Sequence, residues 1–169
     1  ARLATGSNQI VVVVALAIVL IVAGSSAYVG AARLAAEACY RTGAGLVTVA
    51  CTREVQHTIA GSIAEATWLP LEDAGGAIAA SAADAVRDRL TSYDVLLIGP
   101  GLSQVDGVRA LVERVLAGVP ENVRGCVLDA DALNALAQQP GWRIEAPCVL
   151  TPHPGEMARL LGITVQAVQ

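Results

Sequence analysis

Short apolar runs alternate with stretches of helical spacing along this chain, and this alternation limits the possible fold more than any other feature. The clearest runs are residues 46–51, 95–98, 126–128 and 148–150, and helical periodicity separates each from the next. Parallel strands need such crossover helices, and the crossovers are nearly always right-handed. The sequence therefore predicts an α/β fold, a parallel sheet with helices on both faces.

The periodic stretches give the expected helices. They cover residues 30–42, 54–60, 81–90, 107–116, 132–137 and 156–161, and a further short strand is expected at 66–69. In the first helix the expected inward face carries Ala31, Leu34, Ala35, Ala38 and Cys39. In the third helix we expect the inward residues to be Ala85, Val86 and Leu90.

The apolar run at residues 10–23 has two interpretations. Its 14 residues are fewer than the roughly 20 that cross a bilayer. Its Val and Ile content suits a buried strand, and Gly24-Ser25-Ser26 ends it as a strand-to-helix turn would. We predict a strand over residues 11–23, or over the second half only. A membrane or signal segment is the open alternative.

Composition excludes several functions. The chain has 169 residues, 54% of them hydrophobic and 15% charged, which suits one domain with a substantial core. A net charge of −4 without a basic run argues against nucleic-acid binding. No Lys is present, so these residues hold neither a Walker A loop nor a Schiff-base lysine.

Four cysteines occur without C-x-x-C spacing, at positions 39, 51, 126 and 148. Three of them lie in apolar, strand-like runs, which indicates buried free thiols rather than a disulfide or zinc framework. Free thiols fit a reducing compartment, and we expect a cytoplasmic protein without membrane attachment.

Polar or glycine-rich loops follow four of the expected strands. Because the carboxyl ends of parallel strands meet at one edge of the sheet, these loops should form one ligand site. They are residues 24–30, 99–102, 129–134 and 151–156. In the first loop, free backbone N–H groups before a helix could hold a phosphate. In the second, Gly101 leaves room for a flat ring, although both loops could equally be tight turns.

The third and fourth loops carry the side chains that suit chemistry. Asp129 should point at the shared edge, where it could bind hydroxyls or a hydrated metal, and Asn134 lies one turn further on. Asp131 is more consistent with a helix N-cap. Pro152 and Pro154 each favour extended geometry in the residue before them, Thr151 and His153, so the His153 side chain has a defined direction. His153 could donate a hydrogen bond or act as an acid or base. Glu156 could reach Mg²⁺ through water, or it could simply cap a helix.

Five motifs appear in a fixed order and together resemble a known family. They are Gly24-Ser25 with Tyr28-Val29-Gly30-Ala31-Ala32, then RTGAGLVTVA at 41–50, GPGL at 99–102, LDADALN at 128–134 and LTPHPGEMARLL at 150–161. In this order they resemble the ADP/ATP-dependent NAD(P)H-hydrate dehydratases of the ribokinase-like superfamily. The resemblance covers about residues 24–162 and implies a ribokinase-like fold.

The resemblance also implies an activity and a site. The family restores NAD(P)H hydrated on its nicotinamide ring by phosphorylating the added hydroxyl with ADP or ATP and Mg²⁺, and then eliminating phosphate. The implied substrate is (6S)-hydrated NADH or NADPH, and homo-oligomers are implied as well. Substrate-binding positions implied by the family motifs are Gly30, Ala31, Gly101, Asp129, Asn134 and His153. Glu156 resembles the acidic member of an Asn-x-x-Glu element that supports Mg²⁺, and His153 stands in the Asn place.

The sequence departs from the family pattern in two places. The His-Lys-Gly segment usual before Gly24 is absent, and the sequence stops at Gln169. The family continues with a Lys-Gly strand end and a Gly-x-Gly-Asp loop, which hold most of the nucleotide site and the Asp expected as base. We therefore expect a single ribokinase-like domain, 1–169, without its C-terminal nucleotide-binding part. It should bind the hydrate weakly and contain no catalytic residue. The alternatives are a small-molecule kinase of the same superfamily and a non-catalytic dinucleotide-binding or assembly module.

Overall fold

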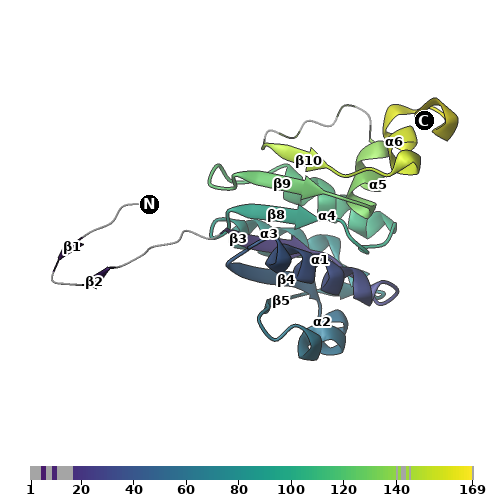
Figure 1. The fold of residues 1–169 in the computed structure, drawn as a ribbon. Coiled ribbons are helices and arrows are strands. Elements are labelled where there is room, and N and C mark those ends of the chain that lie inside the picture. Colours follow the sequence, from purple (N-terminus) through teal and green to yellow (C-terminus); the bar gives the residue numbers. More distant parts are fainter. Residues whose placement is uncertain are drawn as a thin grey trace.

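The computed structural model describes residues 5–6, 9–10, 17–139, 141, 144 and 146–168, and these form an α/β fold around one large sheet (Figure 1). This sheet has six strands in the order β10-β9-β8-β3-β4-β5, and every pairing in it is parallel. The strands are β3 Ile18–Val22, β4 Leu46–Thr52, β5 Thr67–Leu71, β8 Val95–Ile98, β9 Gly125–Leu128 and β10 Cys148–Leu150. The predicted parallel sheet is therefore confirmed.

Two short antiparallel pairs accompany the large sheet. They are β1 Thr5–Gly6 with β2 Gln9–Ile10, and β6 Asp73–Ala74 with β7 Ala77–Ile78. The backbone N–H of Ser26 donates to the Gly76 carbonyl between β6 and β7, at 2.8 Å. This contact joins the β6–β7 hairpin to the loop that follows β3.

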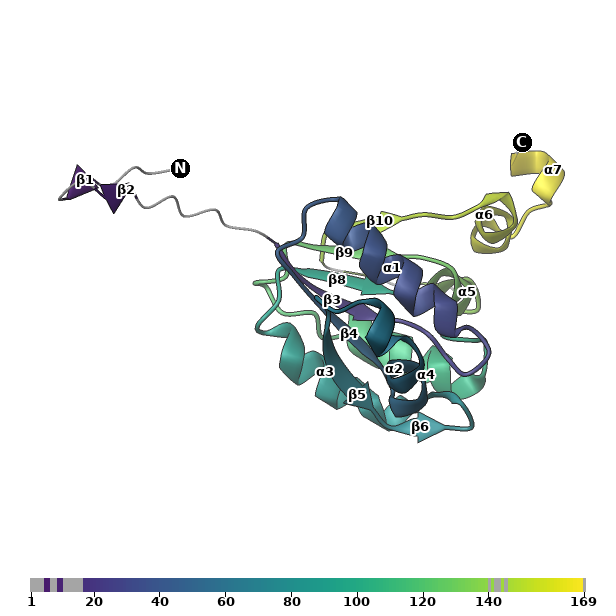
Figure 2. The same cartoon turned by 60° about the horizontal axis from the view of Figure 1, so that its bottom comes forward.

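Helices cover both faces of the sheet, as predicted (Figure 2). On one face lie α1 Val29–Arg41 and α2 Arg53–Ile59, and on the other lie α3 Ala83–Leu90, α4 Asp106–Leu116 and α5 Asp131–Ala137. Helix α6 Pro154–Leu161 packs against α5 and leads to α7 Val165–Val168, and the 3-10 turns are η1 Ala60–Ser62 and η2 Ala80–Ala82.

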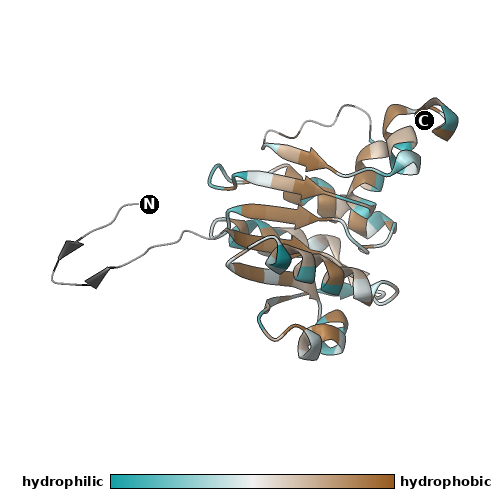
Figure 3. Cartoon of the chain, viewed as in Figure 1, coloured by the Kyte–Doolittle hydropathy of each residue, from teal (hydrophilic) through white to brown (hydrophobic). Residues whose placement is uncertain are grey.

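Strand β3 is buried on both faces of the sheet, which explains why its part of the long apolar run contains no polar residue. Its side chains alternate between the two faces, so Leu20 and Val22 join the core under α3 and α4, and Val19 and Ile21 join the core under α1 and α2. Figure 3 shows the apolar residues concentrated in the strands. The prediction of a strand in the second half of the run is confirmed, whereas residues 11–16 lie outside the described part. Within the described residues, no helix has the length and apolarity to cross a membrane.

The predicted inward face of α1 is partly wrong. Ala32 and Ala36 are fully buried, whereas Leu34 is 67% exposed. Small residues spaced four apart let the helix axis approach the sheet closely, and that packing turns the larger Leu34 outward. Ala38 is also exposed, while Ala35 and Cys39 pack against the core as expected. In α3, Val86 and Leu90 are buried as predicted, but Ala85 is exposed.

All four thiols are free, as predicted. Cys51 in β4 and Cys126 in β9 are buried, and burial raises the pKa of each to about 12. Cys148 in β10 lies opposite Cys126 and is only half-buried. The two buried thiols therefore stay protonated near neutral pH, and they act as small apolar side chains.

The sheet order determines where the functional loops lie. Strands β10, β9, β8 and β3 are consecutive neighbours and run in the same direction (Figure 1). The loops that follow them therefore leave the sheet at the same edge. This is the arrangement in which open α/β sheets bind ligands.

Candidate functional site

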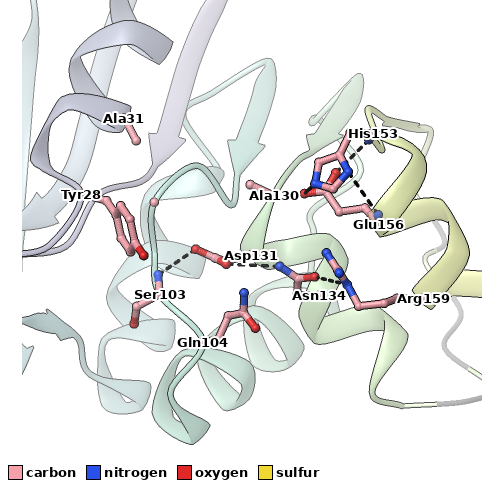
Figure 4. Close-up of a pocket in the computed structure, with 11 residues that line it drawn as sticks. Tyr28, Ala31, Ser103, Gln104, Ala130, Asp131, Asn134, His153, Glu156 and Arg159 are labelled. Atoms are coloured by element: carbon pink, nitrogen blue, oxygen red, sulfur yellow. Dashed lines mark hydrogen bonds and ion pairs between the residues drawn. The ribbon is translucent and has the colours of Figure 1, made fainter. Parts of the chain in front are cut away.

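A cavity of about 500 Å³ lies at this edge, where loops from all four strands meet (Figure 4). Its lining residues are Tyr28, Ala31, Gly101, Ser103, Gln104, Ala130, Asp131, Asn134, His153, Glu156 and Arg159. Five of the seven candidate residues from the sequence line it, namely Ala31, Gly101, Asn134, His153 and Glu156. The expectation that the four loops converge is met by the geometry.

One wall of the cavity has almost no side chains. A Cβ atom on Gly101 would lie 2.7 Å from the Ala31 Cβ and 2.8 Å from the Tyr28 Cβ, and Gly101 has φ +66°. The backbone N–H of Gly24 donates to the Pro100 carbonyl at 2.8 Å. Only glycine at position 101 allows this loop to rest against the start of α1. The wall built from Tyr28, Ala31 and Gly101 is called the steric wall below.

Ser103 continues the same loop in a strained conformation. Its φ is 79°, which is uncommon for a residue with a side chain. Its backbone N–H donates to the Asp131 Oδ2 at 2.8 Å. Its hydroxyl oxygen is buried and has no hydrogen-bond partner among the described residues. Strain of this kind persists where the surroundings enforce it, and here the Asp131 carboxylate holds the loop.

Asp131 has a different role from the one predicted. The N-cap of α5 is Ala130, with φ 48°, and Asp131 is the first helical residue. A carboxylate is favourable in the first turn of a helix, but this one reaches across to the Ser103 backbone. The interpretation of Asp131 as an N-cap is therefore wrong. It joins two loops of the site.

Asn134 extends this connection across the cavity. It is 7% exposed; its Nδ2 donates to the Asp131 Oδ1 at 3.3 Å, and its Oδ1 accepts from the Arg159 Nε at 2.9 Å. These two contacts fix the orientation of the amide. Ser103, Asp131, Asn134 and Arg159 thus form a continuous chain of hydrogen bonds from the loop after β8 to α6 (Figure 4).

His153 and Glu156 form a capping box at the start of α6. The His153 Nδ1 accepts from the backbone N–H of Gly155 at 3.0 Å and from that of Glu156 at 3.4 Å. The Glu156 Oε2 accepts from the backbone N–H of His153 at 2.9 Å. Pro154 keeps His153 extended, with ψ 166°, as the sequence predicts.

The capping box assigns the imidazole proton. Because Nδ1 accepts two N–H groups, the proton of neutral His153 lies on Nε2, which is 3.3 Å from the Glu156 Oε1. The expected acid or base role would therefore break contacts that hold the loop. His153 instead supplies the acceptor that an Asn side chain supplies at a helix N-cap. We refer to Asp131, Asn134, His153, Glu156 and Arg159 as the polar wall.

The described residues do not fit a directly coordinated metal ion. They contain no group of three or more His, Cys, Asp and Glu side chains that could hold one. Both oxygens of Glu156 already lie against His153, so coordination through either would disrupt the capping box. The predicted role of Glu156 in supporting a metal stays a prediction.

Two candidate residues lie away from the cavity. Asp129 is not part of its lining, and its Oδ1 accepts from the Thr151 Oγ1 at 2.8 Å, which ties the third loop to the fourth. Gly30 is exposed in the first turn of α1, and its Cβ position has no atom of the described chain within 4 Å. Their predicted substrate contacts stay untested.

Six residues of the lining were not among the candidates from the sequence, namely Tyr28, Ser103, Gln104, Ala130, Asp131 and Arg159. Tyr28 and Arg159 both lie inside the quoted motifs. Arg159 also follows Glu156 by three residues, so it lies on the same side of α6. That spacing is a signal that could have identified Arg159.

Comparison with known proteins identifies the family. A family model described as NAD(P)H-hydrate dehydratase matches residues 19–169. This chain belongs to that family. It is 48% identical over 160 residues to the bifunctional NAD(P)H-hydrate repair enzyme of Moorella thermoacetica, a match that covers 89% of this chain and 28% of the relative. It is 38% identical over 151 residues to the ADP-dependent (S)-NAD(P)H-hydrate dehydratase of Xanthomonas campestris, with 89% and 50% covered.

Solved structures give the same result for the fold. The ADP/ATP-dependent NAD(P)H-hydrate dehydratase of Bacillus subtilis, co-crystallised with ATP and Mg²⁺ and soaked with CoA, matches with TM-score 0.68 and 30% identity, covering 89% of this chain and 50% of that one. A ribokinase-like superfamily protein from Enterococcus faecalis matches with TM-score 0.75 and 25% identity, again covering 89% and 50%. The ribokinase-like fold is confirmed. The chain spans about half the length of the dehydratases it matches.

Proposed function

We propose that this chain is the hydrate-binding portion of an ADP- or ATP-dependent NAD(P)H-hydrate dehydratase. The whole reaction would be the nucleotide-dependent dehydration of (6S)-hydrated NADH or NADPH to NAD(P)H. One observation carries the proposal: Ala31, Gly101, Asn134 and His153, which come from four motifs of the family resemblance, line a single cavity. Membership of the family supplies the substrate class.

The steric wall would accommodate the hydrated nicotinamide ring. Gly101 and Ala31 leave its surface almost free of side chains, and the ring of Tyr28 borders it (Figure 4). Asn134 and His153 present polar atoms from the opposite side of the cavity. An apolar face with a few fixed polar groups is the usual make-up of a small-molecule site.

The carboxylates of the lining have structural partners, so we propose binding without turnover for this chain alone. Asp131 accepts from Ser103 and Asn134, and Glu156 lies against His153 through both oxygens. A general base needs an acceptor directed at the substrate proton. In the described lining, each carboxylate oxygen of Asp131 and Glu156 already contacts another residue of the protein.

Nucleotide and Mg²⁺ belong to the proposed reaction of the whole enzyme, and no described residue is assigned to them. The relative from Xanthomonas campestris is named as ADP-dependent, and the Bacillus subtilis structure was co-crystallised with ATP and Mg²⁺. Assembly into homo-oligomers and a cytoplasmic location are further parts of the proposal. The location is supported by the four free thiols.

The direct test is to mix the purified 169-residue chain with hydrated NADH. We expect binding by calorimetry, but no recovery of the absorbance of reduced nicotinamide when ATP and Mg²⁺ are added. Nucleotide-dependent recovery would contradict the absence of turnover. A phosphorylated product without recovery would favour a kinase, and failure to bind any hydrate would contradict the function itself.

A matched pair of variants on α1 tests the place of binding. Ala31→Leu adds a side chain to the steric wall, whereas Ala38→Leu adds the same side chain at an exposed position of the same helix. We expect Ala31→Leu to weaken hydrate binding by about 10-fold or more, because overfilling a close-packed site costs about 1–3 kcal/mol. Ala38→Leu should bind as the parent does. Equal affinities in the two folded variants would show that the hydrate binds elsewhere.

A further inference from the structure

Arg159 is the one arginine in the described lining of the cavity, and no carboxylate of the described residues pairs with it. Several other arginines form ion pairs, such as Arg33 with Glu37 and Arg124 with Asp94. No ion pair links Arg159 to another described residue, and its hydrogen bond goes to the neutral Asn134. Its charge is therefore available to a ligand in the cavity.

A hydrogen bond to Asn134 fixes the orientation of the Arg159 side chain. Its Nε donates to the Asn134 Oδ1 at 2.9 Å, and Asn134 is held in turn by Asp131. Asn134 is 7% exposed, whereas Arg159 itself is exposed. A buried amide thus holds an exposed guanidinium and leaves its two terminal amino groups unused by described residues. A guanidinium held in this way is prepared to bind a phosphate through two hydrogen bonds.

The two carboxylates of the lining, Asp131 and Glu156, do not pair with the guanidinium of Arg159. Asp131 contacts Arg159 only through the intervening Asn134 amide, and Glu156 lies against His153. Arg159 also lines a second cavity of about 540 Å³, bordered by apolar residues such as Leu136, Leu150 and Leu160. Among the described lining residues, Arg159 is the one that the two cavities share.

We propose that Arg159 is a specificity-determining residue that binds the diphosphate of a dinucleotide whose nicotinamide ring lies against the steric wall. This inference rests on the proposed function for the identity of the ring, but the anion subsite rests on the guanidinium alone. Ligands that carry the diphosphate should bind through Arg159. Ligands with the ring but without phosphate should not depend on it.

The test compares three probes with the full 169-residue chain, by calorimetry at low salt. The probes are NADH, reduced nicotinamide riboside without phosphate, and inorganic pyrophosphate. The variant is Arg159→Gln, and the control is Arg89→Gln, which removes an exposed charge from α3, a helix with no residue in the described lining of the cavity. A charged hydrogen bond predicts about 10- to 100-fold weaker binding of NADH and pyrophosphate to Arg159→Gln. Riboside binding should change by less than about 2-fold, and Arg89→Gln should bind all probes normally.

The outcomes separate the two proposals. Unchanged NADH and pyrophosphate binding in Arg159→Gln would overturn the subsite and leave the proposed function in place. Arg159-dependent pyrophosphate binding without any nicotinamide binding would keep the subsite and overturn the function. An equal loss for all three probes would show that Arg159 only supports the fold of the cavity. Arg159→Lys keeps the charge and should recover part of the pyrophosphate affinity, and failure of this rescue in a folded variant would also count against the subsite.

Discussion

The steric wall and the polar wall face each other across one cavity, yet different forces hold them. The steric wall depends on missing atoms, because a Cβ on Gly101 would lie 2.7 Å from the Ala31 Cβ and 2.8 Å from the Tyr28 Cβ. The polar wall depends on matched donors and acceptors, from Asp131 to Arg159. Repulsion between atoms rises steeply with overlap, whereas one hydrogen bond contributes a net of only about 0.5–1.5 kcal/mol. The steric wall should therefore tolerate no change, and the polar wall should tolerate changes that preserve donors and acceptors.

The largest expected effect is at Gly99, beside the steric wall. In Gly99→Ala the new Cβ would overlap the Asp129 carbonyl oxygen, at a φ of +130° that side chains rarely adopt. We expect a loss of about 3 kcal/mol in the free energy of unfolding, because overpacking and backbone strain add. Urea denaturation measures it.

Gly107 in α4 provides the control, because its Cβ position has no described atom within 4 Å. Gly107→Ala should stabilise the chain by about 0.5–1 kcal/mol, as alanine favours helix. If Gly99→Ala were as stable as Gly107→Ala, close backbone contact between Gly99 and Asp129 would not be what holds the loops after β8 and β9 together.

The next effect is at Asp131 of the polar wall, which joins the loop after β8 to α5. Asp131→Ala removes the acceptor for the Ser103 N–H and for the Asn134 amide. We expect a loss of about 1–3 kcal/mol, because partly buried donors lose their partners. Asp131→Asn keeps an acceptor for Ser103 and should lose less. Hydrogen exchange at the Ser103 amide reports on the contact, and unchanged protection in Asp131→Ala would contradict the anchoring role.

A smaller effect is expected at His153, where the acceptor matters more than the ring. His153→Ala removes the N-cap acceptor of α6 and should cost about 1 kcal/mol. His153→Asn restores an acceptor at this position and should recover most of the stability. Thermal unfolding of the two variants distinguishes them. Equal losses would indicate that the ring packing of His153, and not its Nδ1, stabilises the loop.

The smallest effect on stability near neutral pH is expected from the thiols in the strands, Cys51 in β4 and Cys148 in β10. Burial raises the pKa of Cys51, in β4, to about 12, whereas Cys148, at the β10 edge, is only half-buried. Iodoacetamide should therefore modify Cys148 well before Cys51 in the folded chain, as peptide mapping would show. A raised folded pKa stabilises the chain fully below the unfolded value of about 8.5, and this stability is lost as pH rises towards 12. Faster labelling of Cys51 would show that the β3–β4 side opens more readily than the β10 edge.

The amino-acid pattern alone was sufficient to predict the order of the elements and the edge of the sheet where the candidate site lies. Strands 95–98 and 148–150 have the predicted bounds, because local apolar runs and the turn residues after them are sufficient to define a strand. Parallel connectivity then places the ends of β3, β8, β9 and β10 at one edge. The family motifs added the candidate residues, and five of these line the cavity.

The contacts of each polar side chain, in contrast, became known only from the three-dimensional packing. Asp129 and Asp131 lie two residues apart in one loop, but Asp129 bonds to Thr151 and Asp131 holds Ser103, 28 residues away. Arg159 joins the cavity through Asn134, 25 residues before it. Such pairs depend on the directions in which separate loops leave the sheet, whereas apolar periodicity reports only which side of its own helix or strand a residue occupies.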